Sequence, residues 1–239
     1  VAESVGRQGC VDEATEVLLE VIENPRMYFH KRQLAASALV RVGHVDKLLE
    51  LAHDVSSDSQ ARVAAIKGLG QLGEAEKRPS GCEAEVARAL LRLTADPKQA
   101  AGLRETAAWA LGQLGYVDEA SEVLLTLASS ADLKSGVRGR AAWALGQLGY
   151  VEEGSEVLLA LAEDASVKTA VRDRAASRLE QLGCVEEASQ ACLTIARDPR
   201  IATRARVRAA WHLGQLGRLE EASRILLAVA KEGHTETEA

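Results

Sequence analysis

Apolar and polar positions along the chain follow the period of an α-helix in segments of about a dozen residues. One segment, 152–162, is acidic in its first turn and apolar afterwards, as is typical of a helix start. A second, 171–182, places apolar residues four, eight and eleven positions after Val171, on one helical stripe. A glycine follows it, as expected after a helix end, and a looser loop separates the two segments. We name the two predicted helices helix A and helix B.

This pair of helices recurs every 34 residues. The segment Ala-Ala-Trp-Ala-Leu-Gly-Gln-Leu-Gly at 107–115 is repeated unchanged at 141–149, and with substitutions at 175–183 and 209–217. A unit of this size cannot bury its apolar face alone, so neighbouring units must stack. We therefore predict an all-α fold: a right-handed α-solenoid of stacked two-helix repeats, with about seven units of which the first and last are incomplete.

The glycine after helix B marks out the units as one predicted domain, 1–239. These glycines are Gly9, Gly43, Gly73, Gly115, Gly149, Gly183 and Gly217. The spacing is irregular over 1–114, where 74–81 reads as a loop insertion, and regular over 115–239. The chain should open with the tail of a helix B at 1–8 and close with a helix A near 220–231, followed by a frayed polar end. Because both ends lie within a repeat, we expect a piece of a longer protein.

Composition supports helices in close contact and argues against several partners. The chain is 47% hydrophobic but only 3% aromatic, so its core must be built from Ala, Leu and Val. A net charge of −6 disfavours nucleic acid and anionic membranes as partners. No apolar run of eighteen residues is present, so we expect no membrane span and a cytoplasmic protein.

The cysteines and histidines give no sign of a metal site or a cofactor. The four cysteines, Cys10, Cys82, Cys184 and Cys192, form no Cys-x-x-Cys pair and have no histidine at ligand spacing. Three of them follow the turn glycine in separate units, too far apart for a disulfide. We expect reduced thiols, with the three at half-buried positions.

The helix B pattern resembles a known repeat family. Val137-Arg138 followed by Ala141-Ala142, Ala144-Leu145-Gly146 and Leu148-Gly149 is similar to HEAT-like repeats of the type first recognised beside phycobilin lyases. The resemblance covers essentially the whole chain. Tetratricopeptide repeats share the 34-residue period, but their Trp and Gly spacing does not match 143–146, and their first helix is longer.

The resemblance also implies a structural ladder of paired acids and arginines. The arginines open successive B helices: Arg32, Arg62, Arg104, Arg138, Arg172 and Arg206. Eight residues before them stand Asn24, Asp54, Asp96, Ser130, Asp164 and Asp198. We expect each carboxylate to accept from the first amides of helix B and to pair with the arginine. Ser130 departs from the pattern, with Asp132 nearby, so the ladder should break or shift in that unit.

Several patterns imitate active sites. Gly68–Gly73 matches the dinucleotide fingerprint Gly-x-Gly-x-x-Gly, but it ends a predicted helix instead of opening one, and no strand precedes it. Acid pairs such as Glu152-Glu153 recur at helix A starts, where they complement the helix dipole. The five histidines occupy unrelated repeat positions. With no nucleophile, metal site or phosphate loop apparent, we predict a protein that is not an enzyme.

The strongest candidate for binding is a stripe on helix B, distinct from its apolar stripe. The positions lie three and seven residues apart and carry Arg, Trp and Gln. The candidate partner-binding residues are Trp109, Gln113, Arg140, Trp143, Gln147, Arg174, Gln181, Arg208, Trp211 and Gln215, with Thr106 and Ser177 at equivalent positions. The resemblance implies that this face lines a concave groove. Aromatic and arginine side chains dominate protein interfaces, although each Trp could instead pack flat against the next repeat.

A cluster of arginines at 197–208 could bind an acidic or phosphate-bearing partner. It comprises Arg197, Arg200, Arg204, Arg206 and Arg208. Arg206 is assigned to the ladder, and the others should project in different directions. We expect a solvated charged surface there.

These observations predict a non-enzymatic scaffold that binds a protein or peptide on the concave helix-B face. The resemblance implies a sensor or docking region of a larger bacterial signalling protein of the NACHT or related ATPase type. Three alternatives remain open: a relative of chromophore lyases, a nucleic-acid-binding HEAT protein, and an engineered repeat array.

Overall fold

A computed structural model describes residues 2–74 and 82–235, and the side chains of 13–73 and 82–232. The predicted insertion at 75–81 and the chain end at 236–239 lie outside these residues. The described residues form α-helices without β-strands, which confirms the predicted all-α repeat solenoid. The helices are α1 (Ala2–Glu23), α2 (Phe29–Val42), α3 (Val45–His53), α4 (Ser59–Gly70), η1 (Gln71–Glu74), α5 (Cys82–Ala95), α6 (Ala101–Gln113), α7 (Val117–Ser129), α8 (Ser135–Gln147), α9 (Val151–Glu163), α10 (Thr169–Gln181), α11 (Val185–Arg197), α12 (Thr203–Gln215) and α13 (Leu219–Thr235).

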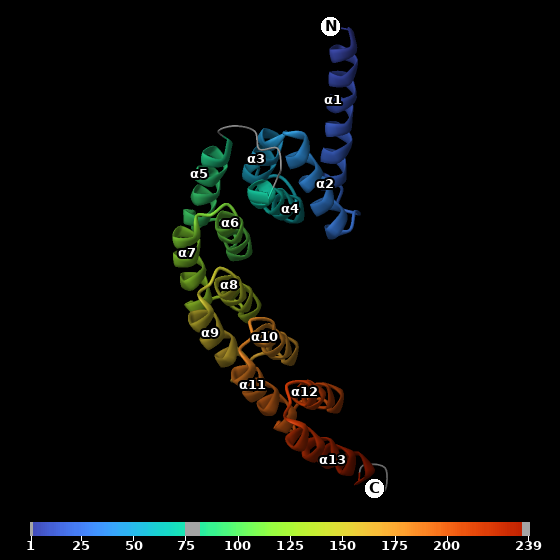
Figure 1. Ribbon diagram of the computed structural model, residues 1–239, viewed down its shortest axis with the longest axis vertical. Helices are drawn as coiled ribbons and strands as arrows, with labels where there is room; N and C mark the ends of the chain where they lie inside the picture. Colours follow the sequence, from blue (N-terminus) through green and yellow to red (C-terminus); the bar gives the residue numbers. More distant parts are fainter. Residues whose placement is uncertain (1, 75–81, 236–239) are drawn as a thin grey trace. The chain divides into compact units, whose positions relative to one another are not determined.

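The chain divides into two compact units, Val1–Leu124 and Leu125–Ala239. In unit 1, α1 packs on α2, α2 on α4, α3 on α4 and α5, and α6 on both α4 and α5. In unit 2, each odd-numbered helix from α9 to α13 is a helix A and each even-numbered helix from α8 to α12 is a helix B. Within this unit, α8, α10 and α12 form one layer and α9, α11 and α13 the other (Figure 1).

Left-handed glycines end most B helices, as the sequence predicts. Among the described residues, five glycines adopt positive φ, between 79° and 101°: Gly43, Gly115, Gly149, Gly183 and Gly217. At Gly43 and Gly183, the residue after the glycine donates its backbone N–H to the carbonyl five residues earlier, which satisfies an end carbonyl of the helix. Gly73 differs because α4 continues directly into η1.

The predicted break at Gly9 is wrong. Helix α1 runs from Ala2 to Glu23 without interruption, so the expected helix B tail and the following helix A form one helix. Eight residues are fewer than the 13 of a full helix B such as α10. A separate helix this short would bury little apolar surface by packing back against its neighbour. A continuous helix instead keeps the backbone hydrogen bonds across residues 9–10.

The core is built from small and aliphatic side chains on the facing sides of the two layers. Ala141, Ala142 and Leu145 of α8 are at most 1% exposed, and so is Leu158 of α9. Small side chains let the helices lie close together. A core with few aromatic side chains needs this close approach to stay free of cavities. None of the described helices combines the length and apolarity of a membrane span.

The arginine ladder joins each helix B to the end of the preceding helix A by a hydrogen bond that recurs from unit to unit. In five units the arginine Nε donates to the carbonyl ten residues earlier, in the last turn of helix A. For Arg172 this bond to the Ala162 oxygen measures 2.8 Å. Carbonyls in the last turn of a helix have no partner within the helix, so the arginine supplies the missing donor. Arg32 is the exception and donates to the Met27 oxygen at 3.3 Å.

The acidic half of the ladder differs from the prediction. Each of the four acids accepts from the backbone N–H two residues later in the loop, not from the first amides of helix B, and Asn24 does the same. The bonds of Asn24, Asp54, Asp96, Asp164 and Asp198 measure 2.8–3.0 Å. Short Asx side chains reach this amide because the loop turns sharply. The hydroxyls of Ser57 and Ser56 lower the pKa of Asp54 to about 2.

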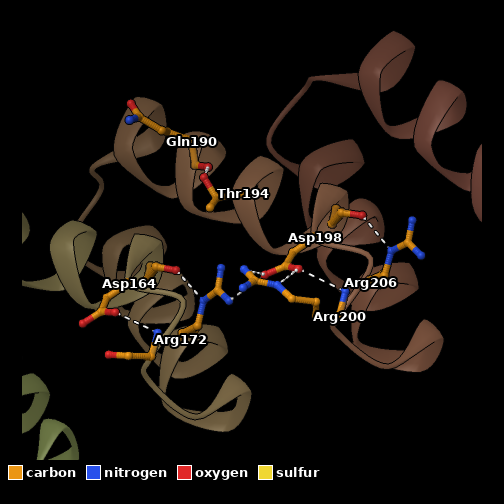
Figure 2. Close-up of polar contacts among 10 residues, drawn as sticks. Asp164, Arg172, Gln190, Thr194, Asp198, Arg200 and Arg206 are labelled. Carbon is orange, nitrogen blue, oxygen red and sulfur yellow. Dashed lines mark hydrogen bonds and ion pairs between the residues drawn. The ribbon is translucent and has the colours of Figure 1, made fainter.

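The ion pairs of the ladder connect successive repeats. Arg172 reaches Asp198 of the following repeat at 3.3 Å (Figure 2). Arg206 reaches Glu232, 26 residues later, at 3.1 Å. The predicted pairing within one repeat is therefore wrong for Arg172, because its Nε is turned back to helix A while its terminal nitrogens face the next loop. At Ser130 the backbone bond persists, since Arg138 donates to the Ala128 oxygen at 3.0 Å.

Candidate functional site

The candidate site is a row of polar and aromatic side chains on the helix B layer of unit 2. We define the helix-B stripe by positions that share one face: Arg140, Trp143 and Gln147 of α8; Arg174, Ser177 and Gln181 of α10; and Arg204, Arg208, Trp211 and Gln215 of α12. Eight of these residues are candidate partner-binding residues of the sequence prediction, and all of the eight but Trp143 are exposed. The ladder arginines and the Ala/Leu core of the same helices face the opposite way, which fixes this orientation.

Arg204 joins the stripe because it lies one helical turn before Arg208. The expectation that the cluster arginines other than Arg206 project in different directions is therefore wrong for Arg204 and Arg208, which share one face of α12. Arg206 is buried in the ladder, and Arg200 binds the Asp198 carboxylate through Nε at 2.9 Å.

Trp211 is the most accessible indole of the stripe. Its side chain is 55% exposed on α12, and the ring of His212 lies against its edge with ring centres 5.1 Å apart. His212 is in turn held 3.5 Å from the Glu180 carboxylate of α10. Trp211 therefore offers an exposed apolar surface beside a histidine that contacts the neighbouring helix α10.

The sequence left open whether each tryptophan is exposed for binding or packed against the next repeat, and Trp143 is partly both. It is half-buried, and the guanidinium of Arg178 from the next helix B lies over its ring at 5.8 Å. Such a cation–π contact contributes about 0.5–1 kcal/mol at exposed sites. The ring thus packs against the next repeat while part of it stays accessible.

In unit 1, Trp109 and Gln113 of α6 are both half-buried. A side-chain carbon added at Gly70 of α4 would lie 2.6 Å from the Gln113 amide oxygen. Gln113 therefore belongs to the contact between α4 and α6, unlike the exposed Gln147, Gln181 and Gln215.

Neighbouring B helices are linked by contacts that the sequence reasoning missed. Asp173 of α10 accepts from Arg208 of α12 at 3.1 Å through Nε and at 2.8 Å through Nη2. The two pairs Asp173–Arg208 and Trp143–Arg178 are each 35 residues apart. A search for complementary residues at one repeat plus one position would have found both.

The cysteines, the possible metal ligands and the glycine-rich segment of α4 form no further candidate site among the described residues. Cys82 and Cys184 are half-buried, Cys192 is buried, and none of the three forms a disulfide. The described residues contain no cluster of His, Cys, Asp or Glu that could hold a metal ion. Gly68 and Gly70 lie in the last turn of α4, where a side-chain carbon at Gly68 would meet Ala36 at 2.9 Å. The Gly-x-Gly-x-x-Gly match therefore serves helix packing.

Comparison with protein-family models agrees with this architecture. The family model described as HEAT repeats matches residues 45–134 and 88–180, which together span more than half of the chain. No curated protein matches. Among solved structures, a crystal structure titled an engineered protein of the Northeast Structural Genomics Consortium is 18% identical, with 91% of this chain and 96% of that chain covered and a TM-score of 0.34.

Proposed function

We propose that this chain, which belongs to the HEAT repeat family, is a non-enzymatic scaffold that binds a protein or peptide on the helix-B stripe of unit 2. The observation that carries the proposal is the exposure of Trp211 in a row of arginines and glutamines on packed helices. Tryptophan and arginine are enriched at the residues that dominate protein interfaces. A rigid layer also lowers the entropy lost on binding.

The rest of the stripe supports a binding surface that extends over three repeats. Arg140, Gln147, Arg174, Gln181 and Gln215 are exposed at equivalent positions of α8, α10 and α12. A core residue repeated in this way would be buried, as the alanines of the same helices are. If the chain acts as the docking region of a larger signalling protein, the same stripe would hold its partner.

The test compares Trp211→Ala with Leu227→Ala in affinity capture of partners from the source cell extract. Leu227 is a matched control because it is 64% exposed on α13, in the other layer. We expect Trp211→Ala to lose captured proteins that the wild type and Leu227→Ala retain, while the circular dichroism and melting temperature of both variants stay near wild type. Capture that is equal for all three proteins would contradict the proposal.

A further inference from the structure

The charge on the helix-B stripe is opposite to that of the chain as a whole. The stripe holds four arginines, Arg140, Arg174, Arg204 and Arg208, and no carboxylate, whereas the chain carries a net charge of −6. Glu152, Glu186 and Glu220 are exposed at the starts of the A helices. Unit 2 therefore presents positive charge on the face of one layer and negative charge at the helix starts of the other.

Two of these arginines have all their donors available. Arg208 is bound in a two-contact pair with Asp173. Arg174 and Arg204 are exposed, and no hydrogen bond or ion pair engages either side chain among the described residues. An unpaired guanidinium presents five donors in a planar fork that matches a carboxylate.

The cationic positions recur at the spacing of packed helices. Arg140, Arg174 and Arg208 occupy the same position of α8, α10 and α12, and adjacent helices of this kind lie about 8–10 Å apart. An extended peptide advances about 3.3 Å per residue. A peptide that crosses the three helices would therefore meet one arginine at about every third residue.

We propose that the partner segment is an acidic, extended peptide whose carboxylates, about three residues apart, pair with Arg174 and Arg204, while an apolar side chain covers Trp211. This inference rests on the proposed function and names the chemistry of its partner. The exposed glutamates of the A helices repel such a segment from the other layer, so complementary charge also determines which face it binds.

Selection of random 12-residue peptides displayed on phage tests this inference. The immobilised intact chain is the target, and Trp211→Ala provides a counter-selection against peptides that bind elsewhere. The double variant Arg174→Glu/Arg204→Glu reverses the charge of the stripe. Arg197→Glu/Arg224→Glu is its matched control, since it makes the same change of net charge at two exposed arginines of α11 and α13.

We expect the peptides that depend on Trp211 to be rich in Asp and Glu at about three-residue spacing. Synthetic copies should bind at least about tenfold more weakly to the stripe variant, because attractive charge pairs become repulsive, and with unchanged affinity to the control. Trp211-dependent peptides that are neutral or basic would overturn the inference and leave the proposed function standing. The absence of any Trp211-dependent peptide would overturn both.

A second probe separates peptide from nucleic acid. A fluorescein-labelled single-stranded oligonucleotide of 20 nucleotides should bind more weakly than the selected peptides in fluorescence anisotropy. If it bound more tightly, and lost binding in Arg174→Glu/Arg204→Glu but not in the control, the inference would be wrong in favour of nucleic acid.

Discussion

Arg172 binds the carboxylate of Asp198 across the junction between two repeats, with Nη1 and Oδ2 3.3 Å apart. The same guanidinium donates through Nε to the Ala162 carbonyl of its own repeat. One buried side chain therefore ties the end of α9 to the loop after α11. Because a repeat array is stabilised by the interfaces between units, these bonds contribute to the rigidity of the layer that carries the stripe.

Replacing Arg172 by Met should destabilise the protein by about 2–4 kcal/mol. The arginine is 2% exposed, and its loss leaves the Ala162 carbonyl and the Asp198 carboxylate without a donor from this side chain. Urea unfolding followed by circular dichroism measures the effect. Arg200→Met is the matched control, because Arg200 also binds Asp198 but its side chain is 72% exposed. Equal midpoints for the two variants would show that the buried arginine has no special role.

The loop acid Asp54 should make stability depend on pH in the acidic range. Its folded pKa of about 2 lies below the usual value of 3.8, so the folded state favours the carboxylate. The resulting stabilisation is complete above about pH 4 and is lost as the pH falls towards 2. Asp54→Asn keeps an acceptor, as Asn24 shows in the first loop by accepting from the Arg26 N–H at 2.9 Å.

The stability advantage of the wild type over Asp54→Asn should therefore shrink between pH 4 and pH 2. Urea midpoints measured in steps across this range provide the comparison. Asp46→Asn, an exposed acid of α3 outside the loop, controls for a general loss of negative charge. A constant gap between wild type and Asp54→Asn at all pH values would contradict the assignment.

The repeat pattern predicts the fold well because each signal is local. A glycine in the left-handed region and an apolar stripe need only neighbouring residues, so Gly43 and Gly183 could be assigned from the sequence. The partners of long polar side chains could not be assigned in this way. Arg172 has an acid eight residues before it and another 26 residues after it, and only the packing of the next repeat selects the second.

For the helix-B stripe, too, the sequence predicts the local geometry but not the contacts with the next repeat. Periodicity places Arg140, Trp143 and Gln147 on one face, and this follows from helix geometry alone. How much of each indole is covered depends on the residue that the next helix presents. Arg178 lies over Trp143, while Trp211 remains 55% exposed, so identical positions differ in accessibility.

Gly154→Ala should destabilise the protein although alanine stands at the equivalent positions 120, 188 and 222. A side-chain carbon at Gly154 would lie 2.5 Å from the Ala142 backbone oxygen and 3.0 Å from the Gly146 backbone nitrogen. Backbone atoms cannot move aside cheaply, so we expect a cost of about 1–3 kcal/mol from overpacking.

The control for this prediction is Gly136→Ala in α8, where an added side-chain carbon has no neighbour within 4 Å. Relief from the low helix propensity of glycine should stabilise that variant by up to about 1 kcal/mol. Thermal unfolding of both variants should thus give shifts of opposite sign. Stabilisation by Gly154→Ala would show that α8 and α9 can separate without loss of packing.

The two cysteines of α11 and its preceding turn should differ strongly in reactivity. Burial raises the pKa of the Cys192 thiol to about 12, and it also raises the pKa of Cys184. Since the thiolate is the reactive form, Cys192 stays protonated at pH 8 and is shielded by packing, whereas Cys184 is only half-buried. Iodoacetamide labelling read by peptide mass spectrometry should modify Cys184 first and Cys192 only when urea unfolds the chain. Labelling of both at the same rate in the native protein would mean that the α11 interface opens readily, and the stripe would then lack the rigid support on which its binding role depends.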